Sequence, residues 1–371
     1  MEREVLSVEP AKLLDALADG VYATDTRRRI IYWNRAAERI TGYRADEVIG
    51  RSCFCGVLAH VDKDGRRLCG RDTCPLQRAI ATGQPSRRPL IIFARKKSGA
   101  RLPTQVSVAP LRDPAGRVIG GVEVFRDSTG LLDDLERAAA IQRHAVRLEL
   151  PQDPRISFAA RATPLDFVGG DFHHVDRLDA DRYALFIADV TGHGVAAALY
   201  TMQLRMLWEE LRARWTDPAA LLAAMSDRLR SVLQRAEDFA TALAAVVDLG
   251  ARSLTFASAG HPPPLWLAAD GRGAVLAAEG VPLGLFAGTR YHAQTQPLGA
   301  GDRLLFCSDV AVEQNDAQGR ELGPEGLLAL LQQLPYDGSA ASLVALEQRL
   351  LSFSGAIRLD DDLTLVGARL A

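Results

Sequence analysis

The chain has 371 residues, enough for two domains, and its 48% hydrophobic and 24% charged residues are typical of a globular protein in water. The formal net charge of −2 gives no overall attraction to nucleic acid or to an anionic membrane. No apolar run approaches the roughly 18 residues that span a bilayer, and the N-terminus lacks the basic-then-apolar pattern of a signal peptide, so we expect a cytoplasmic protein.

Residues 1–128 are predicted to form a first domain of short helices and strands. One helix is expected at residues 8–20, and another begins at Asn34 and ends near Gly42. Strand patterns cover residues 21–24, 30–33, 88–95, 101–111 and 117–125. Turn sequences separate the last three strands, which is typical of hairpins. We therefore expect one antiparallel sheet with helices on one face.

This order of elements resembles a PAS sensor domain over residues 10–129. The residues that carry the resemblance are Asp19-Gly20-Val21, Thr24-Asp25, Tyr32-Trp33-Asn34-Arg35-Ala36-Ala37-Glu38, Thr41-Gly42-Tyr43, Ile49-Gly50 and the stretch from Gly121 to Thr129. The resemblance implies a domain that senses a ligand or a redox state and passes the signal through the helix that follows. The fold alone does not name the ligand.

Four of the five cysteines lie close together in this domain, at Cys53, Cys55, Cys69 and Cys74. Four thiolates can hold zinc or an iron–sulfur cluster, and some PAS oxygen sensors carry such clusters. The spacing departs from the usual Cys-x2-Cys pairs. The alternative is four reduced cysteines, some of them buried as small hydrophobic side chains.

Residues 129–150 are predicted to form a helical linker. Leu131, Leu135, Ala138 and Ala145 fall near a heptad seam, with charged residues outside it. This pattern favours a short parallel coiled coil, and hence a homodimer through the PAS domain and the linker. The alternative is a plain helical spacer, because two heptads are too few to decide.

Residues 151–371 are predicted to form a second domain of the α+β class. The run from Tyr183 to Ala188 has the length and composition of a buried strand. Further strands are expected at residues 241–249, 252–259, 303–308 and 363–366. Helices are expected at residues 194–215, 217–235, 323–334 and 339–353.

Acidic residues recur where these strands begin or end. A hairpin is expected to bring Asp171 and Asp189 together, Asp309 follows the strand at 303–308, and three acids at 360–362 precede the last strand. A single aspartate at a strand end is usually a turn former or a helix cap. Three contiguous acids repel one another, however, and a cation removes that cost. Carboxylates without cysteine or histidine favour Mg²⁺ or Mn²⁺.

Five motifs in chain order carry a second resemblance, over residues 155–371. They are Gly169-Gly170-Asp171-Phe172, the loop from Asp189 to Gly194, Ser258-Ala259-Gly260-His261-Pro262-Pro263, Ser308-Asp309 with Glu313, and Asp361-Asp362-Leu363-Thr364. They resemble the PPM (protein phosphatase 2C-like) serine/threonine phosphatases of the SpoIIE type. The resemblance implies an αββα sandwich and two Mn²⁺ or Mg²⁺ ions that activate water for attack on a phosphate ester.

The resemblance also implies roles for individual residues at the first ion. Asp189 is expected to bridge both ions and to act in catalysis, with the carbonyl of Val190 as an extra ligand. Asp309 and Asp361 are expected to hold the first ion.

At the second ion, Asp171 is expected to be a metal-supporting and catalytic residue, and Asp362 is expected to orient the ligands. His193 is a candidate for proton transfer to the leaving group, with loop packing as the alternative. Two residues depart from the family pattern: His174 stands where a second acid is usual, and Val310 stands where glycine follows the Ser-Asp pair.

These observations predict a PAS-regulated, metal-dependent phosphatase that acts on phosphoserine or phosphothreonine. Its family implies a phosphorylated protein substrate, an anti-sigma-factor antagonist of the STAS type. The competing hypothesis is a catalytically impaired adaptor that senses through its PAS domain and binds a partner. A third hypothesis is a metal-containing redox sensor that binds nucleic acid through the ten basic residues between positions 66 and 101, but this stretch lacks a nucleic-acid motif and interleaved aromatics.

Overall fold

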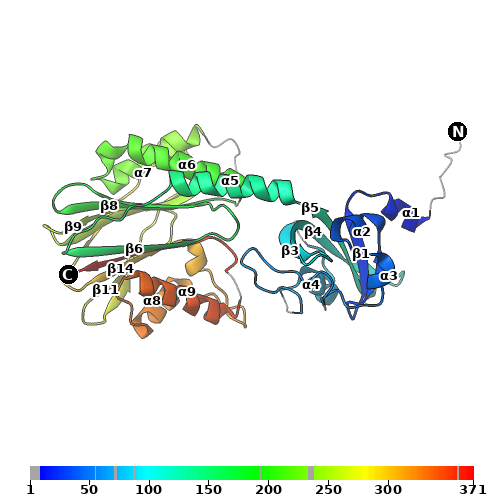
Figure 1. Ribbon diagram of the computed structural model, residues 1–371. Coiled ribbons are helices and arrows are strands. Elements are labelled where there is room, and N and C mark those ends of the chain that lie inside the picture. The colour runs from blue at the N-terminus through cyan, green and yellow to red at the C-terminus, as the bar shows by residue number, and fades with distance from the viewer. Residues whose placement is uncertain are drawn as a thin grey trace. The chain divides into compact units, whose positions relative to one another are not determined.

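The computed structural model describes residues 9–54, 56–70, 73–86, 89–192, 194–232, 238–356 and 359–371. The chain divides into two compact units, residues 1–134 and 135–371 (Figure 1). Helix α5 (Thr129–Ala145) crosses the boundary between them. Within the described ranges, no helix is both long enough and apolar enough to cross a membrane. The predictions for Cys55 and His193 lie outside the described residues.

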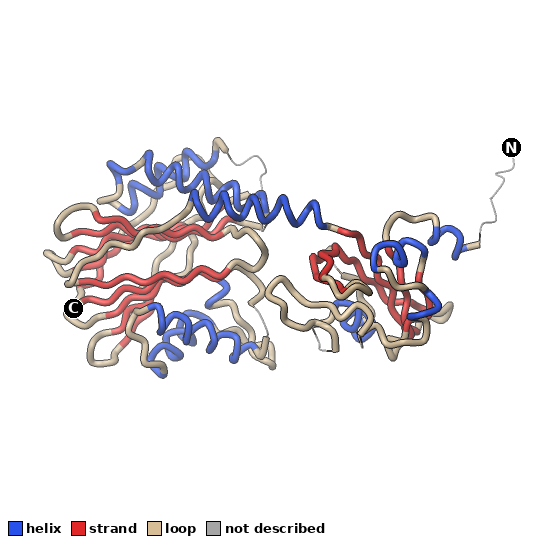
Figure 2. Tube along the Cα trace, in the orientation of Figure 1, coloured by secondary structure: helices blue, strands red, loops and turns tan. Residues whose placement is uncertain are grey.

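The first unit contains one antiparallel sheet of five strands in the order β2-β1-β5-β4-β3. Figure 2 draws strands in red and helices in blue. Its strands are β1 (Gly20–Asp25), β2 (Ile30–Trp33), β3 (Leu90–Arg95), β4 (Arg101–Arg112) and β5 (Val118–Asp127). Its helices are α1 (Pro10–Asp15), α2 (Arg35–Thr41), α3 (Ala45–Val48) and α4 (Pro75–Thr82). The predicted sheet and the predicted helix after Asn34 are therefore present.

Asn34 shows why the first helix after the opening hairpin begins where it does. Its side-chain oxygen accepts hydrogen bonds from the backbone N–H groups of Ala37, at 2.8 Å, and Val21, at 2.9 Å. The first bond caps α2 and the second ties that cap to β1. Gly42 ends the helix with φ of 79°, a left-handed conformation that favours glycine.

The second unit is built from two five-stranded antiparallel sheets (Figure 1). One has the order β13-β10-β9-β8-β7 and the other β12-β11-β14-β15-β6. The strands are β6 (Ile156–Thr163), β7 (Asp171–Arg177), β8 (Arg182–Val190), β9 (Ala240–Asp248), β10 (Ser253–Ala259), β11 (Leu265–Leu267), β12 (Gly273–Val275), β13 (Gln294–Pro297), β14 (Arg303–Cys307) and β15 (Leu363–Leu370). Apolar side chains from both sheets, including Ile187 and Val366, pack together between them.

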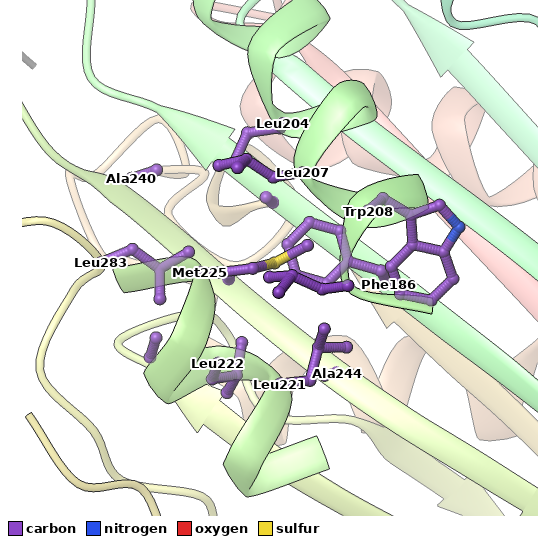
Figure 3. Packing of buried hydrophobic residues seen from close by; sticks show 14 of the residues in the cluster. Phe186, Leu204, Leu207, Trp208, Leu221, Leu222, Met225, Ala240, Ala244 and Leu283 are labelled. Atoms are coloured by element: carbon purple, nitrogen blue, oxygen red, sulfur yellow. The ribbon is translucent and has the colours of Figure 1, made fainter. Parts of the chain in front are cut away.

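A pair of helices covers the outer face of each sheet, so the unit has four layers. Helices α6 (Val195–Glu210) and α7 (Pro218–Arg230) cover the first sheet, and α8 (Gly323–Gln333) and α9 (Ala340–Ser354) cover the second. Figure 3 shows Phe186 of β8 packed against Trp208 and Met225 from the first helix pair. The predicted α+β class and the αββα sandwich are confirmed.

The helix expected at residues 194–215 ends earlier, at Glu210. A short 3₁₀ turn (Arg212–Arg214) follows, and it places the ring of Trp215 on that of Trp208, with centroids 4.2 Å apart. The indole N–H of Trp215 donates to the carbonyl of Trp208 at 2.8 Å. Burial of two stacked indoles therefore overrides the helical pattern of the sequence.

The second half of α5 is part of the second unit. Ala139 is buried against Val168 and Ala198, and Gln142 is 8% exposed. Leu131 of the predicted heptad seam is exposed. The buried side of the helix thus includes positions beside the predicted seam, and this part of the helix is packed on the domain rather than a free spacer.

Candidate active site

Strands β7 and β8 place two acidic residues opposite each other. Asp171 and Asp189 are direct partners in the antiparallel register, so their side chains lie on the same face of the sheet. The backbone N–H of Val190, the last residue of β8, donates to the carbonyl of Gly170 at 3.2 Å, which extends the pairing by one residue before the start of β7. The predicted hairpin is present.

Gly169 and Gly170 allow neighbouring groups to come very close to the start of β7. A Cβ on Gly170 would lie 2.9 Å from the carbonyl oxygen of Val190, and a Cβ on Gly169 would lie 2.8 Å from a carboxylate oxygen of Asp362. Neither space admits a side chain. The two glycines are therefore needed for contact between this loop and the acidic residues.

Asp362 fastens this loop to the last strand of the chain. One of its oxygens accepts from the N–H of Leu165 at 2.7 Å and the other from the N–H of Gly170 at 2.6 Å. These bonds join the residue just before β15 to the loop just before β7. The two strands belong to different sheets. Both oxygens of Asp362 are thus already used in holding the loop.

Ser308 connects two further acidic segments. Its hydroxyl accepts from the N–H of Thr364 at 2.9 Å and donates to the carbonyl of Asp362 at 3.2 Å. Asp309 follows at once, at the start of a 3₁₀ turn (Asp309–Ala311). The end of β14 and the start of β15 are therefore locked side by side, which brings Asp309 towards Asp361.

Burial and mutual repulsion perturb the central carboxyl groups. Burial raises the pKa of Asp171 well above its usual range, and the charges of Asp189 and Asp362 add to the rise. Burial likewise raises the pKa of Asp189, with further contributions from Asp309 and Asp361. Carboxyl groups that raise one another's pKa values form a site where negative charge is concentrated and poorly solvated.

Asp309 shows the same effect more mildly. Burial, followed by the charges of Glu313 and Asp361, raises the pKa of Asp309 to about 6. The acids at the ends of β7, β8 and β14 and before β15 thus influence one another.

Two observations bear on whether these residues suit a divalent cation. Both carboxylate oxygens of Asp171 are buried and make no hydrogen bond, although the nearby hydroxyls of Ser308 and Thr364 partly offset the rise in its pKa. Across the described ranges, no three acidic, histidine or cysteine side chains already form a ligand set for one ion. The donor atoms are all oxygens, and an added cation would satisfy the orphaned carboxylate, so the residues fit Mg²⁺ or Mn²⁺ in kind.

The remaining predicted residues occupy distinct positions. Val190 is buried with its carbonyl beside Gly170, and Asp361 lies exposed at the edge of the cluster next to the exposed Asp360. Val310 is buried in the core beneath the second sheet, within the 3₁₀ turn and without positive φ. A valine is therefore accommodated without strain where the related phosphatases have glycine.

His174 lies on the face of β7 opposite to Asp171. Its Nδ1 atom is 2.7 Å from a carboxylate oxygen of Asp176, which also accepts from the indole of Trp208 at 2.8 Å. Its ring packs near those of Phe172 and Trp208. This departure from the family pattern therefore changes the packing beneath helix α6 rather than the acidic cluster.

Gln142 of α5 is a site neighbour that the sequence reasoning did not single out. Its side-chain amide donates to the carbonyl of Gly169 at 2.7 Å and to the hydroxyl of Thr201 at 2.8 Å. It also lines a cavity of about 190 Å³ together with Phe167, Asp171 and His173. Only its place in the linker, next to the catalytic motifs, could have suggested such a contact.

The four-layered unit and its acidic cluster define the fold of a protein phosphatase 2C-type domain, preceded here by a PAS fold. The chain belongs to the family described as Stage II sporulation protein E (SpoIIE), which matches residues 179–371, and the PAS fold matches residues 14–132. Both resemblances seen in the sequence are confirmed.

The chain is similar to two proteins of Bacillus subtilis strain 168. It is 27% identical to phosphoserine phosphatase RsbP over 183 residues, which is 48% of this chain and 45% of the relative. It is 26% identical to phosphoserine phosphatase RsbU over 240 residues, or 64% of this chain and 70% of the relative. The chain thus spans less than half the length of the first of these relatives.

Solved structures give the same fold. The PP2C domain of SiaA from Pseudomonas aeruginosa aligns with a TM-score of 0.55 and 25% identity, covering 66% of this chain and 98% of that domain. The RsbU and RsbW domains of Rv1364c from Mycobacterium tuberculosis align with a TM-score of 0.50 and 27% identity, covering 61% and 62% of the two chains.

Proposed function

We propose that this chain is a PAS-regulated phosphatase that hydrolyses phosphoserine or phosphothreonine in a protein substrate. The observation that carries the proposal is the orphaned, buried carboxylate of Asp171 opposite Asp189, within a cluster of acids from both sheets. Membership of the SpoIIE family and similarity to two phosphoserine phosphatases support the reaction type.

Two divalent cations, Mn²⁺ or Mg²⁺, would be held by this cluster. Asp189 would contact both ions, with the Val190 carbonyl beside it, and Asp309 and Asp361 would complete the first site. Asp171 would serve the second. When bound, such ions lower the pKa of water and neutralise the charge on phosphoryl oxygens.

The chain's own residues give the site its shape. Asp362 holds the loop before β7 through the N–H groups of Leu165 and Gly170, so its role is to orient rather than to supply a free oxygen. Ser308 fixes Asp309 next to the start of β15. Because the pKa values of Asp171 and Asp189 are raised, a cation that binds these carboxylates would have to displace their protons, which couples metal affinity to pH.

Hydrolysis of an aryl phosphate by the full chain, with and without Mn²⁺, tests the proposal. Asp189→Asn and Asp309→Asn should each lower the metal-dependent rate by about a hundredfold or more, since several kcal/mol of charge stabilisation are lost. Asp360→Asn is the matched control, because this exposed aspartate belongs to the same acidic run. It should leave the rate unchanged.

An inactive wild-type chain that still binds a partner would favour the adaptor hypothesis instead. Equal losses in Asp189→Asn and Asp360→Asn would indicate a general charge effect rather than a site.

The proposed substrate is a phosphorylated anti-sigma-factor antagonist of the STAS type, as the family resemblance implies. We further propose a homodimer formed through the PAS domain and α5, a helix on which Leu131 and Ile141 are exposed. Light scattering of the full chain tests the dimer, and Ile141→Glu should weaken it if this exposed side is the contact.

A further inference from the structure

Two cysteines of the first unit lie together in its core. Cys69 and Cys74 are 4% and 3% exposed, and the thiol of Cys69 donates a hydrogen bond to the sulfur of Cys74. The Cys69 sulfur in turn accepts from the backbone N–H of His60 at 3.1 Å. Both sulfurs are therefore held in place, in contact with each other.

Cys74 occupies the position that caps helix α4. Its side chain makes no capping hydrogen bond, but the backbone N–H groups of Leu76 and Gln77, in the first turn of this eight-residue helix, help to lower the pKa of Cys74. The guanidinium of Arg28 adds a positive charge nearby. A helix N-terminus and an adjacent cation both stabilise a thiolate.

The two sulfurs consequently differ in protonation. The hydrogen bond from Cys69, ahead of the backbone N–H groups and Arg28, lowers the pKa of Cys74, while the same bond and burial raise the pKa of Cys69. Burial raises the pKa of both Cys53 and Cys307 to about 12. Among the described cysteines, Cys74 is the one whose pKa is lowered, and the thiol of Cys69 lies beside it.

Two residues near Cys74 in the sequence carry buried polar atoms. Thr73 and Gln77 each have a buried side-chain oxygen that makes no hydrogen bond. Within the described ranges, Cys53, Cys69 and Cys74 do not form a ligand set for a metal ion.

We propose that Cys74 and Cys69 form a modification site for hydroperoxides, at which Cys74 is oxidised and Cys69 closes a disulfide. The thiolate of Cys74 attacks one oxygen of hydrogen peroxide, the O–O bond breaks, and hydroxide leaves. Sulfur is oxidised to the sulfenic acid as the peroxide is reduced. Cys69 then attacks the Cys74 sulfur, the S–O bond breaks, and its proton and the released hydroxyl leave as water.

The test uses the full chain, purified under reducing conditions, freed of reductant and exposed to an equimolar amount of hydrogen peroxide. The number of free thiols should fall from five to three, and the mass of the chain should drop by that of two hydrogen atoms. Trypsin cuts after Arg71, between the two cysteines, so the disulfide should appear as two peptides joined through Cys69 and Cys74.

Variants separate the two steps. Cys69→Ser should stop at the sulfenic acid of Cys74, which dimedone traps, and Cys74→Ser should prevent oxidation of the pair. Cys307→Ser, which removes a buried thiol of the second unit, is the control and should leave the disulfide unchanged.

Three results would overturn the proposal. One is an unchanged thiol count in the wild-type chain, and the second is a disulfide that uses Cys53 instead. The third is a stoichiometric zinc or iron content that disappears in Cys74→Ser, which would assign the cysteines to a metal. The peptide map of the wild-type chain decides the first two even if a variant fails to fold.

Discussion

Gln142 and Gly169 exchange two hydrogen bonds: the side-chain amide donates to the Gly169 carbonyl at 2.7 Å, and its oxygen accepts from the Gly169 N–H at 3.3 Å. One residue of helix α5 thereby holds the backbone immediately before Asp171. The buried amide also donates to Thr201 of α6, so it ties together three segments of the second unit.

Replacing Gln142 by alanine should weaken both the fold and the acidic cluster. The change leaves the partly buried N–H and carbonyl of Gly169 without these partners, at a cost of about 1–3 kcal/mol. We expect a lower free energy of unfolding in urea and a lower Mn²⁺-dependent rate. Gln152→Ala is the matched control, because that glutamine is exposed, and an equal effect there would contradict the role assigned to Gln142.

Replacing Gly170 by alanine should separate the strands that carry Asp171 and Asp189. The new methyl group would lie 2.9 Å from the Val190 carbonyl oxygen, and relief of such a contact costs about 1–3 kcal/mol. We expect the Mn²⁺ concentration for half-maximal activity to rise. Gly130→Ala serves as control, since no atom lies within 4 Å of its Cβ position. It should change neither the pairing of these strands nor the Mn²⁺ concentration for half-maximal activity.

A buried pair in the first unit should make its stability depend on pH. His60 Nε2 lies 3.6 Å from Glu123 Oε1, but burial dominates both groups. It lowers the pKa of His60 from 6.5 to about 4, to which Arg101 contributes, and raises that of Glu123 from 4.5 to about 8, to which Cys74 contributes. Both groups are therefore uncharged in the folded chain between these values.

Below pH 6.5 the contributions of His60 and Glu123 to stability change with pH in opposite directions. Above pH 6.5 the contribution of His60 is constant. Stability from neutral His60 is present above pH 6.5 and is lost as the pH falls towards 4. Stability from protonated Glu123 is present below pH 4.5 and is lost as the pH rises towards 8. From pH 6.5 to 8 the contribution of Glu123 falls by about 2 kcal/mol as the pH rises, while the lowered pKa of Cys74 acts in the opposite direction over the same range.

Glu123→Gln should remove this dependence. The variant keeps the shape of the side chain but cannot ionise, so its unfolding midpoint should rise relative to that of wild type between pH 6.5 and 8. Circular dichroism during urea titration at several pH values measures both. A parallel fall in the two proteins would assign the pH dependence to another group.

Restoring the acid of the related phosphatases by His174→Asp should not raise activity. The position faces Asp176 and Trp208 on the far side of β7 from Asp171, so a carboxylate there is buried beside another one. We expect a loss of about 1–3 kcal/mol in unfolding free energy. His292→Asp, at an exposed histidine, is the control; a faster metal-dependent reaction in His174→Asp would contradict our interpretation.

The sequence predicts much of this structure because its local signals agree with the fold. The Asn34 cap, the hairpin between Asp171 and Asp189, and the apolar run from Tyr183 to Ala188 all lie where their patterns indicate. Strand-end aspartates could be recognised as a group because they recur at the same kind of position.

Other features depend on contacts between distant segments, which no local pattern encodes. The hydrogen bond that Gly170 donates to Asp362 spans 192 positions of sequence, and the two between Gln142 and Gly169 span 27. The orientation of His174 follows from the register of β7 rather than from the motif around it. The end of α6 at Glu210 reflects the stacking of Trp215 on Trp208.

Strand β15 lies between β14 and β6 in the interior of its sheet, with Leu370 opposite Ile156. During synthesis, β6 must therefore wait for some two hundred later residues before its partner leaves the ribosome. Until then the edges of β6 and β14 are unpaired and open to association with other chains. The step that closes the sheet also delivers Asp361 and Asp362, so the nascent domain cannot gain its acidic cluster before its core is complete.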